Sequence, residues 1–131
     1  MCFITYNISK GKLKGLVKLF EVEFYEKSDG TYPAEEFILS QDIKMQTKLF
    51  RLLELLELKG NELREPYSKS LSDGIFEICA IQGNNITRVL YFFVVGKKII
   101  LTNGFVKKTQ RTPESEIALA KKYRKDYMLR K

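Results

Sequence analysis

The chain has 131 residues, of which 44% are hydrophobic and only three are proline, so its length and composition fit one folded domain. It contains no histidine, which excludes His-based catalytic triads, His-ligated metal sites and imidazole acid–base pairs. The net charge is +7: residues 97–131 hold eleven Lys or Arg against three acidic residues, and residues 1–18 hold four lysines and no acidic residue. Such concentrated positive charge is typical of proteins that bind a phosphate backbone, whereas a basic surface that only aids solubility is the alternative.

The beginning of the chain is predicted to lie outside the folded domain. Residues 1–18 are interpreted as an N-terminal appendage or linker, in which residues 3–8 form a short strand before a segment rich in Gly and Lys. The domain itself is predicted to span residues 19–131. It begins with a half-buried strand, because Phe20–Tyr25 alternates apolar and acidic residues.

Two helices are predicted next. The turn Ser28–Gly30 ends the first strand, and Pro33 suits the first turn of a helix over residues 34–39. A longer helix is predicted from about Asp42 to Leu58, with Gly60 as its C-terminal stop. Its apolar residues fall on one broad stripe that is typical of a core-facing helix: Met45, Leu49, Leu52, Leu53 and Leu56.

A β-hairpin is predicted after Gly74. If Asn84 and Asn85 form a two-residue turn, Cys79 faces Leu90 and Glu77 faces Phe92. One face of the hairpin is then almost wholly apolar, with Phe76, Ile78, Ala80, Val89, Tyr91 and Phe93, and is expected to receive the helices. The opposite face holds the only charges of the two strands, on Glu77 and Arg88, so it is the predicted working face.

The last part of the chain combines a strand, a basic segment and a helix. Gly96 and Lys97 support a tight turn before a returning strand over residues 98–102, and the basic run Lys107–Arg111 follows. Thr112 is a suitable N-cap for a helix that extends to about Leu129, with Pro113 as its first residue. The predicted order of elements is therefore β-α-α-β-β-β-α.

Phosphoryl chemistry on RNA is compatible with the polar residues that remain. When a ribose 2′-hydroxyl attacks the adjacent phosphate, the substrate brings its own nucleophile, and the protein must orient the backbone, neutralise charge and assist proton transfer. An arginine such as Arg88 can contact phosphate through two N–H groups, and clustered lysines can lower one another's pKa toward the range of a general base. The same cluster equally fits a protein that only binds RNA, and Arg88 could instead pair with Glu77.

Four segments in order resemble the RelE/HigB superfamily of bacterial toxins, specifically its phage-derived branch. They are Gly74–Ile78, Arg88–Phe93, Gly104–Gln110, and the Thr112-Pro113 pair with Glu116, Ile117 and Ala120 after it. The resemblance extends from about Phe20 to Tyr127. It implies a small α+β ribonuclease with an antiparallel sheet, two N-terminal helices packed on one face, and a C-terminal helix.

The resemblance also implies a function and partners. Such toxins cut mRNA, typically on the translating ribosome, and are neutralised by an antitoxin encoded beside them, which is expected here to be a helix-turn-helix protein in a higher-order complex with the toxin. By analogy Arg88 would contact the scissile phosphate, and Lys107 and Lys108 would stabilise charge or transfer a proton. The residues expected to contact RNA around them are Glu77, Cys79, Tyr91, Arg111, Lys121 and Lys122.

Cys79 marks a departure from that branch, which usually places an arginine after the Glu-Leu or Glu-Ile pair. A toxin with weakened activity, or a non-catalytic module that binds RNA or ribosomes, is therefore the alternative function. Cys2 and Cys79 show no metal-ligand spacing, and no metal or cofactor is expected. The sequence also has no signal-peptide pattern and no apolar run of membrane-spanning length, so a cytoplasmic protein without membrane contact is predicted.

Overall fold

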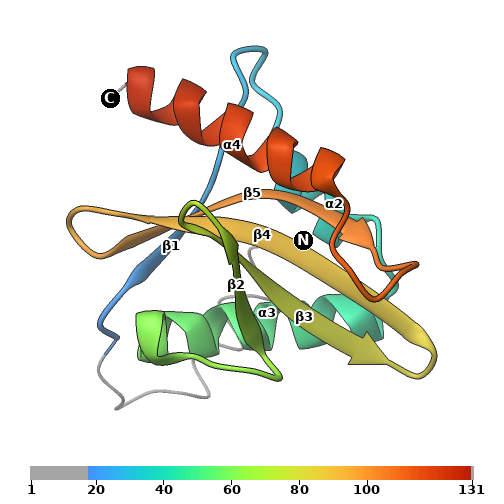
Figure 1. The fold of residues 1–131 in the computed structure, drawn as a ribbon. Coiled ribbons are helices and arrows are strands. Elements are labelled where there is room, and N and C mark those ends of the chain that lie inside the picture. The colour runs from blue at the N-terminus through green and yellow to red at the C-terminus, as the bar shows by residue number, and fades with distance from the viewer. Residues whose placement is uncertain (1–17, 131) are drawn as a thin grey trace.

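A computed structural model describes residues 18–130 of the chain (Figure 1). The elements, in chain order, are β1 (Glu21–Phe24), α2 (Pro33–Leu39), α3 (Ile43–Lys59), a 3₁₀ turn η1 (Gly60–Glu62), β2 (Ser68–Ser72), β3 (Ile75–Gln82), β4 (Asn85–Val94), β5 (Lys98–Val106) and α4 (Glu114–Leu129). The protein is thus α+β with a C-terminal helix, as the sequence predicted. The predicted appendage and its strand at residues 3–8 lie almost entirely outside the described residues.

The five strands form one mixed sheet in the order β1-β5-β4-β3-β2. The prediction of an antiparallel sheet is corrected at one edge, because β1 pairs with β5 in parallel, with Val22 opposite Ile99 and Phe24 opposite Leu101. A parallel pair needs a long connection between its strands. Here the connection contains both N-terminal helices and the β2–β4 strands, so no local turn signal could have indicated that β1 joins β5.

The helices cover both faces of the sheet. Figure 1 shows α3 and α4 on opposite sides of it. Ala34 and Ile38 of α2 lie in one buried cluster with the apolar stripe of α3 and with Ile78, Val89 and Tyr91 of the sheet. Ala120 and Tyr127 of α4 pack in a second, smaller cluster with Ile75, Leu90, Phe92 and Ile100. We refer to these two sides as the α3 face and the α4 face.

A glycine determines the turn of the β3–β4 hairpin. In the β3–β4 hairpin Gln82 pairs with Asn85, so the turn residues are Gly83 and Asn84, and Glu77 faces Leu90 while Cys79 faces Arg88. The predicted Asn84-Asn85 turn is therefore wrong by one residue. The reason is that a type II′ turn needs a positive φ at its first position, which Gly83 supplies with φ +62°. With the correct turn, each residue of β3 faces a residue of β4 two positions away from the predicted one. Side chains alternate between the faces along a strand, so every residue stays on its predicted face.

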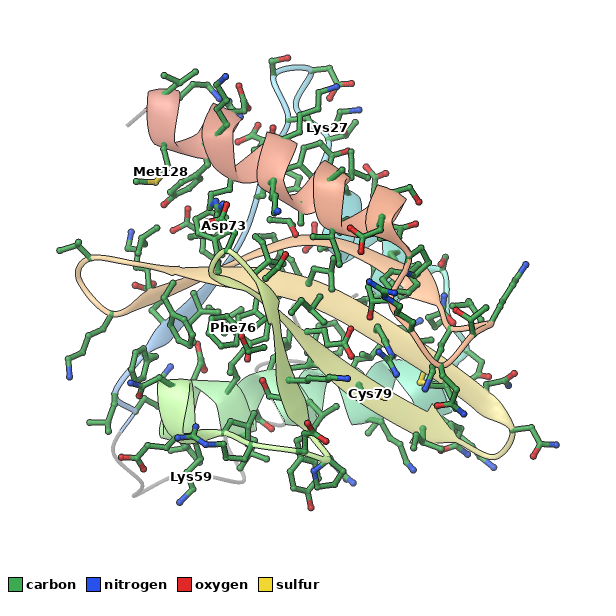
Figure 2. The ribbon with its side chains drawn as sticks, viewed as in Figure 1. Lys27, Lys59, Asp73, Phe76, Cys79 and Met128 are labelled. Atoms are coloured by element: carbon green, nitrogen blue, oxygen red, sulfur yellow. The ribbon has the colours of Figure 1, made fainter. Side chains whose placement is uncertain are left out.

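The strand β2 has no counterpart in the sequence prediction. Its residues, Ser68–Ser72, are mostly polar, so they lack the apolar alternation that indicates a strand. The signal that could have found it is the dipeptide Asp73-Gly74, a strong indicator of a type I′ hairpin turn. Both residues have positive φ, 51° and 78°, and Ser72 pairs with Ile75 across them. The side chain of Arg124 in α4 bonds Asp73 at 2.8 Å, which ties this turn to the helix (Figure 2).

The long helix α3 follows its sequence signals closely. Asp42 caps it by accepting a hydrogen bond from the Met45 amide at 2.8 Å, and Gly60 ends it with φ +54°. The helix α4 begins at Glu114, with Pro113 at the N-cap position, so the predicted N-cap, Thr112, lies one residue too early. The hydroxyl of Thr112 donates instead to Glu77 of β3. Within residues 18–130 no helix is long and apolar enough to cross a membrane.

Candidate functional site

Sheet pairing places the charged hairpin residues in two adjacent rows on the α4 face. One row joins Lys69 of β2, Glu77 of β3 and Leu90 of β4, because Lys69 pairs with Glu77 and Glu77 with Leu90. The next row joins Cys79, Arg88 and Phe105 of β5. Directly opposite side chains in an antiparallel pair lie about 4.5–5.5 Å apart at Cβ. The sheet therefore brings Lys69, Glu77 and Arg88, which are far apart in sequence, into one neighbourhood.

Arg88, Glu77 and Thr112 form a buried polar cluster within this neighbourhood. Arg88 Nη1 donates to Glu77 Oε2, Thr112 Oγ1 donates to Glu77 Oε1, and Arg88 Nη1 also donates to Thr112 Oγ1 at 3.0 Å. The exposed fractions of the three residues are 7%, 2% and 5%. In this arrangement the Arg88 charge is matched by Glu77, the alternative that the sequence left open. Arg88 Nε is buried and has no hydrogen-bond partner among residues 18–130.

Thr112 joins this buried cluster to a surface groove. The groove has a volume of about 510 Å³ and lies between β2 and the segment that leads into α4. Its lining includes Lys69, Ser70, Ser72, Arg111, Thr112 and Glu114. Because Thr112 lines the groove and accepts the Arg88 bond, Arg88 and Glu77 lie one side chain behind the groove surface.

The basic segment before α4 is largely exposed at the same end of the sheet. The Lys107 amide donates to the Ile86 carbonyl oxygen at 2.8 Å, which continues the β4–β5 pairing and fixes where the segment leaves the sheet. Lys107 is half-buried, and Lys108 and Arg111 are exposed. Arg111 Nη2 lies 3.3 Å from Glu114 Oε2, but both side chains are exposed, so this ion pair adds little stability and can open at small cost.

The structure separates the other predicted RNA contacts. Tyr91 is buried on the α3 face, where its hydroxyl bonds Ser68, so it does not lie beside Arg88. Cys79, a free cysteine, is half-buried on the part of β3 that leads to the β3–β4 turn (Figure 2). Lys121 and Lys122 lie on α4, the first half-buried and the second exposed. Of the predicted set, the structure brings Glu77, Cys79 and Arg88 together, while Lys107 and Arg111 lie in the segment between β5 and α4.

Sequence reasoning missed three residues of this region, because it expected Thr112 only as a helix cap and did not single out Lys69 or Asn103. Lys69 lies on the unpredicted strand β2, and Asn103 lies where a bulge interrupts the β4–β5 pairing between Val89 and Tyr91. The Asn103 amide nitrogen donates to Glu116 Oε1 at 3.0 Å, at the start of α4, while its buried oxygen has no partner in the described part of the chain. Bulges often redirect a side chain next to a functional site. The Asp73-Gly74 turn signal would have located Lys69, but no local signal indicates the bulge.

The other end of α4 is held by a tyrosine–aspartate bond. Tyr25 Oη donates to Asp126 Oδ2 at 2.5 Å, and Arg130 Nη2 lies 2.6 Å from the same oxygen. Burial, together with the bond to Asp126, raises the pKa of Tyr25 to about 12. The bond from Tyr25, followed by the contact with Arg130, lowers the pKa of Asp126. This arrangement keeps α4 in place over the α4 face and so keeps Thr112 over Glu77.

The described residues offer no obvious metal site. Within residues 18–130, no three His, Cys, Asp or Glu side chains gather as they would around a metal ion. The groove therefore presents hydroxyl groups, two exposed cations and, behind Thr112, a buried arginine–glutamate pair. Chemically these groups can hold an anion and stabilise added negative charge.

Comparison with known proteins places the chain in a family. A search among curated proteins finds no match. The family model described as "Phage derived protein Gp49-like (DUF891)" matches residues 36–125, which include α3, all strands except β1, and most of α4. The chain therefore belongs to the Gp49-like family of phage-derived proteins.

Proposed function

We propose that this protein is the toxin of a toxin–antitoxin pair and that it cleaves mRNA. Two lines of support are independent of one another. The Gp49-like family is associated with toxin–antitoxin systems. The groove beside β2 supplies the exposed cations Lys69 and Arg111 together with the hydroxyls of Ser72 and Thr112, a suitable surface for the backbone of a single RNA strand.

The observation that carries the proposal is the position of Thr112, between that groove and the buried Arg88–Glu77 pair. A phosphate in the groove at Thr112 would lie one side chain from the Arg88 guanidinium. Arginine can donate two parallel hydrogen bonds to phosphate, so it is suited to stabilising the phosphorane-like transition state of 2′-hydroxyl attack. To do so, Arg88 must exchange its Glu77 contact for the phosphate, and the released carboxylate is then free to accept a proton.

The basic segment supplies the remaining charge. Lys107 and Lys108 leave the sheet next to the Cys79–Arg88–Phe105 row, where they would stabilise negative charge or transfer a proton to the leaving 5′-oxygen. We further propose that cleavage takes place on the translating ribosome and that a helix-turn-helix antitoxin encoded nearby neutralises the toxin. Induced expression should then arrest bacterial growth, and co-expression of the neighbouring antitoxin should restore it.

The decisive experiment is cleavage by an Arg88→Lys variant. Lysine keeps a cation beside Glu77 but cannot make the bidentate contact with phosphate that arginine makes. The rate of mRNA cleavage, mapped by primer extension, should therefore fall about 10²-fold or more, with little change in melting temperature. Arg51→Lys, an exposed position on α3, is the matched control and should cleave like the wild type. Undiminished cleavage by a soluble Arg88→Lys protein would remove Arg88 from the mechanism.

A second function is favoured by the Arg88–Glu77 pair itself. If the two side chains never separate, the cluster is structural, and the groove serves a module that binds RNA or ribosomes without cutting. Cys79, opposite Arg88, stands where related toxins carry an arginine, which also fits a weakened toxin. Growth arrest without any mapped cleavage site, together with ribosome binding that depends on Arg111, would support this function over the first.

A further inference from the structure

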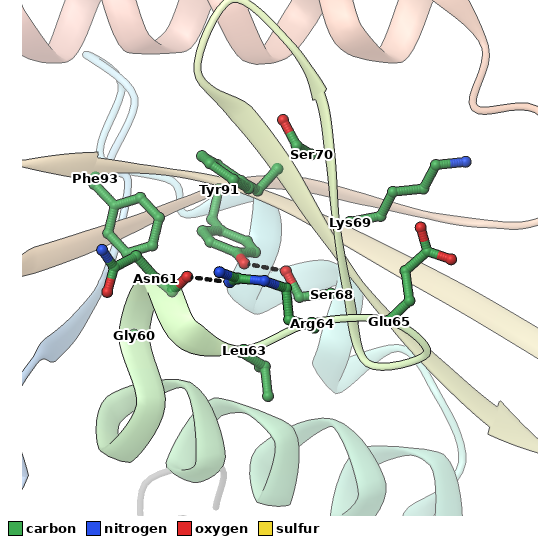
Figure 3. Close-up of a pocket in the computed structure, with 11 residues that line it drawn as sticks. Gly60, Asn61, Leu63, Arg64, Glu65, Ser68, Lys69, Ser70, Tyr91 and Phe93 are labelled. Atoms are coloured by element: carbon green, nitrogen blue, oxygen red, sulfur yellow. Dashed lines mark hydrogen bonds between the residues drawn. The ribbon is translucent and has the colours of Figure 1, made fainter.

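A separate pocket lies on the α3 face, on the other side of β2 from the groove. Its volume is about 360 Å³, which is at the small end of the range for ligand sites in proteins. Along β2 the side chains alternate between the two sides, so Ser68 and Ser70 belong to this pocket, opposite Ile78 and Phe76. Figure 3 shows the Lys69 side chain extending away from Tyr91 and Phe93.

Three aromatic side chains form the floor of the pocket. Phe76 and Tyr91 are stacked with ring centroids 5.5 Å apart, and Phe93 contacts both edge-on at 5.3 and 5.7 Å. Tyr91 is 1% exposed, whereas Phe76 and Phe93 are only partly buried. Aromatic surface is therefore open to the pocket, and such surface stacks well on planar rings.

The floor also carries an unused hydrogen-bond donor. The hydroxyls of Ser68 and Tyr91 bond each other at a buried position (Figure 3). Each hydroxyl has one hydrogen, and only one of the two hydrogens lies between the oxygens. Within residues 18–130 neither hydroxyl has another partner, so one buried O–H is left to donate to an acceptor in the pocket. A buried donor without an acceptor is costly, which favours a polar occupant.

A cation lies at the mouth of the pocket. Arg64 Nη1 donates to the Asn61 carbonyl oxygen of η1, as Figure 3 shows, and this is its one side-chain hydrogen bond within the described part of the chain. A guanidinium has five N–H donors, so most of them remain available. No carboxylate among residues 18–130 forms an ion pair with Arg64. The mouth thus offers an anion-binding group above an aromatic floor.

We propose that this pocket binds a nucleotide, with the base on the aromatic floor and the phosphate at Arg64. A base is planar and carries acceptors on its edge for the free hydroxyl hydrogen, and a phosphate matches the guanidinium. Two sources share this chemistry: a free nucleoside monophosphate, and a base turned out of an RNA strand that also occupies the groove. Binding here requires no cleavage, so the proposal stands apart from the ribonuclease function.

The test is a titration of the full-length protein with AMP, with UMP and with a short single-stranded oligouridylate, followed by chemical-shift changes at Phe76, Tyr91 and Phe93. Arg64→Gln should weaken binding about tenfold, as expected for the loss of one charge-assisted contact. Arg64 is exposed, so the fold should be kept, and a matching melting temperature verifies this. Arg51→Gln, which removes the same charge from α3 outside this pocket, is the control and should bind normally.

The three ligands distinguish a free nucleotide from a base of an RNA strand as the natural occupant of the pocket. Saturable binding of AMP or UMP at these rings supports a free-nucleotide site, and binding of the oligouridylate alone supports a base subsite of RNA. A Phe93→Leu variant adds a second check, because it keeps an apolar floor but removes one stacking ring and should weaken binding in either case. No saturable shift with any of the three ligands, or equal losses in Arg64→Gln and Arg51→Gln, would overturn the proposal.

Discussion

The two faces of the sheet are built by different physical means. The α3 face is covered by a large, mainly aliphatic cluster in which fully buried leucines of α3 meet Ile78, Val89 and Leu101. The α4 face has a smaller apolar cluster and, beside it, the buried polar residues Glu77, Arg88, Asn103 and Thr112. Burial of apolar surface stabilises a fold directly, whereas a buried ion pair roughly offsets its own desolvation.

This contrast indicates what each face does. The α3 face supplies most of the stability, because its buried apolar cluster is the larger of the two, although Glu54 and Glu57 of α3 are buried there as well. The α4 face keeps charges that well-packed hydrophobic residues could replace without loss of stability. Retention of such groups beside a groove is expected of a functional site, and this is the physical reason for placing the proposed RNA site on the α4 face.

The largest effect should come from breaking the buried pair on the α4 face. Glu77→Ala leaves the Arg88 charge buried and unmatched, so the free energy of unfolding should fall by about 3–5 kcal/mol. The double variant Glu77→Met with Arg88→Met should recover most of that loss, because no charge is then buried. Urea denaturation of the three proteins measures this. A Glu77→Ala loss under about 1 kcal/mol would mean that water reaches the pair and that the two faces differ less than we argue.

On the α3 face, stability should instead be sensitive to changes in side-chain volume. A Cβ added at Gly104 would lie 2.3 Å from Phe37 Cδ2, so Gly104→Ala should lower the free energy of unfolding by about 1–3 kcal/mol through overpacking. Phe37→Ala opens that space, so the double variant should lose less than the sum of the single losses. If the two losses in unfolding free energy, measured by thermal or urea denaturation, are additive, α2 must shift to accommodate the new Cβ, and the contact between Gly104 and Phe37 is not tightly packed.

A smaller, pH-dependent effect should report how α4 is held on its face. The pKa of Tyr25 is raised from 10.0 to about 12, so the neutral tyrosine is favoured in the folded state. This contribution to stability is fully present below pH 10 and is lost as the pH rises through about 12. Tyr25→Phe should therefore flatten the fall in unfolding midpoint over that window. Tyr91, whose pKa burial also raises, stays in both proteins and serves as the internal reference. Identical pH profiles would show that the Tyr25–Asp126 bond does not hold the helix.

The smallest effect should be electrostatic and confined to RNA binding. Lys69→Gln combined with Arg111→Gln removes the two exposed cations of the groove, so the logarithmic salt slope of single-stranded RNA binding should decrease by about 0.7 for each lost phosphate contact. Lys48→Gln with Arg51→Gln, both exposed on α3, removes the same charge from the other face. Equal slopes in the two double variants would mean that RNA is attracted by net charge and not by the groove.

Local patterns were sufficient for much of the fold. The stripe from Met45 to Leu56 identifies α3 and its buried side, and Asp42 and Gly60 mark its ends. Alternation along β3 and β4 assigns each residue to a face, and this assignment holds although the predicted turn was wrong by one residue. Periodicity of two or of 3.6 residues is a local property, so it is readable before any long-range contact is known.

The candidate site depended on contacts between distant segments. Glu77 and Thr112 are 35 residues apart, and their bond forms only because α4 crosses the sheet there and brings its preceding loop over β3. Thr112, a good helix cap by its local sequence, does not cap α4. A capping hydroxyl accepts a hydrogen bond from a backbone N–H, whereas the Thr112 oxygen accepts from Arg88 and its hydrogen is donated to Glu77.

The sequence by itself determined which residues are apolar on which face, where the main helices and strands lie, and that the C-terminal third is basic. The tertiary structure decided that β1 joins the sheet in parallel, that Lys69 on an edge strand lies beside Glu77, and that Thr112 bonds the buried Arg88–Glu77 pair. The physical reason is the range of the interactions. Turn conformation and periodicity act between near neighbours, whereas strand order and the pairing of buried charges are fixed only when the whole sheet and both helical layers close around them.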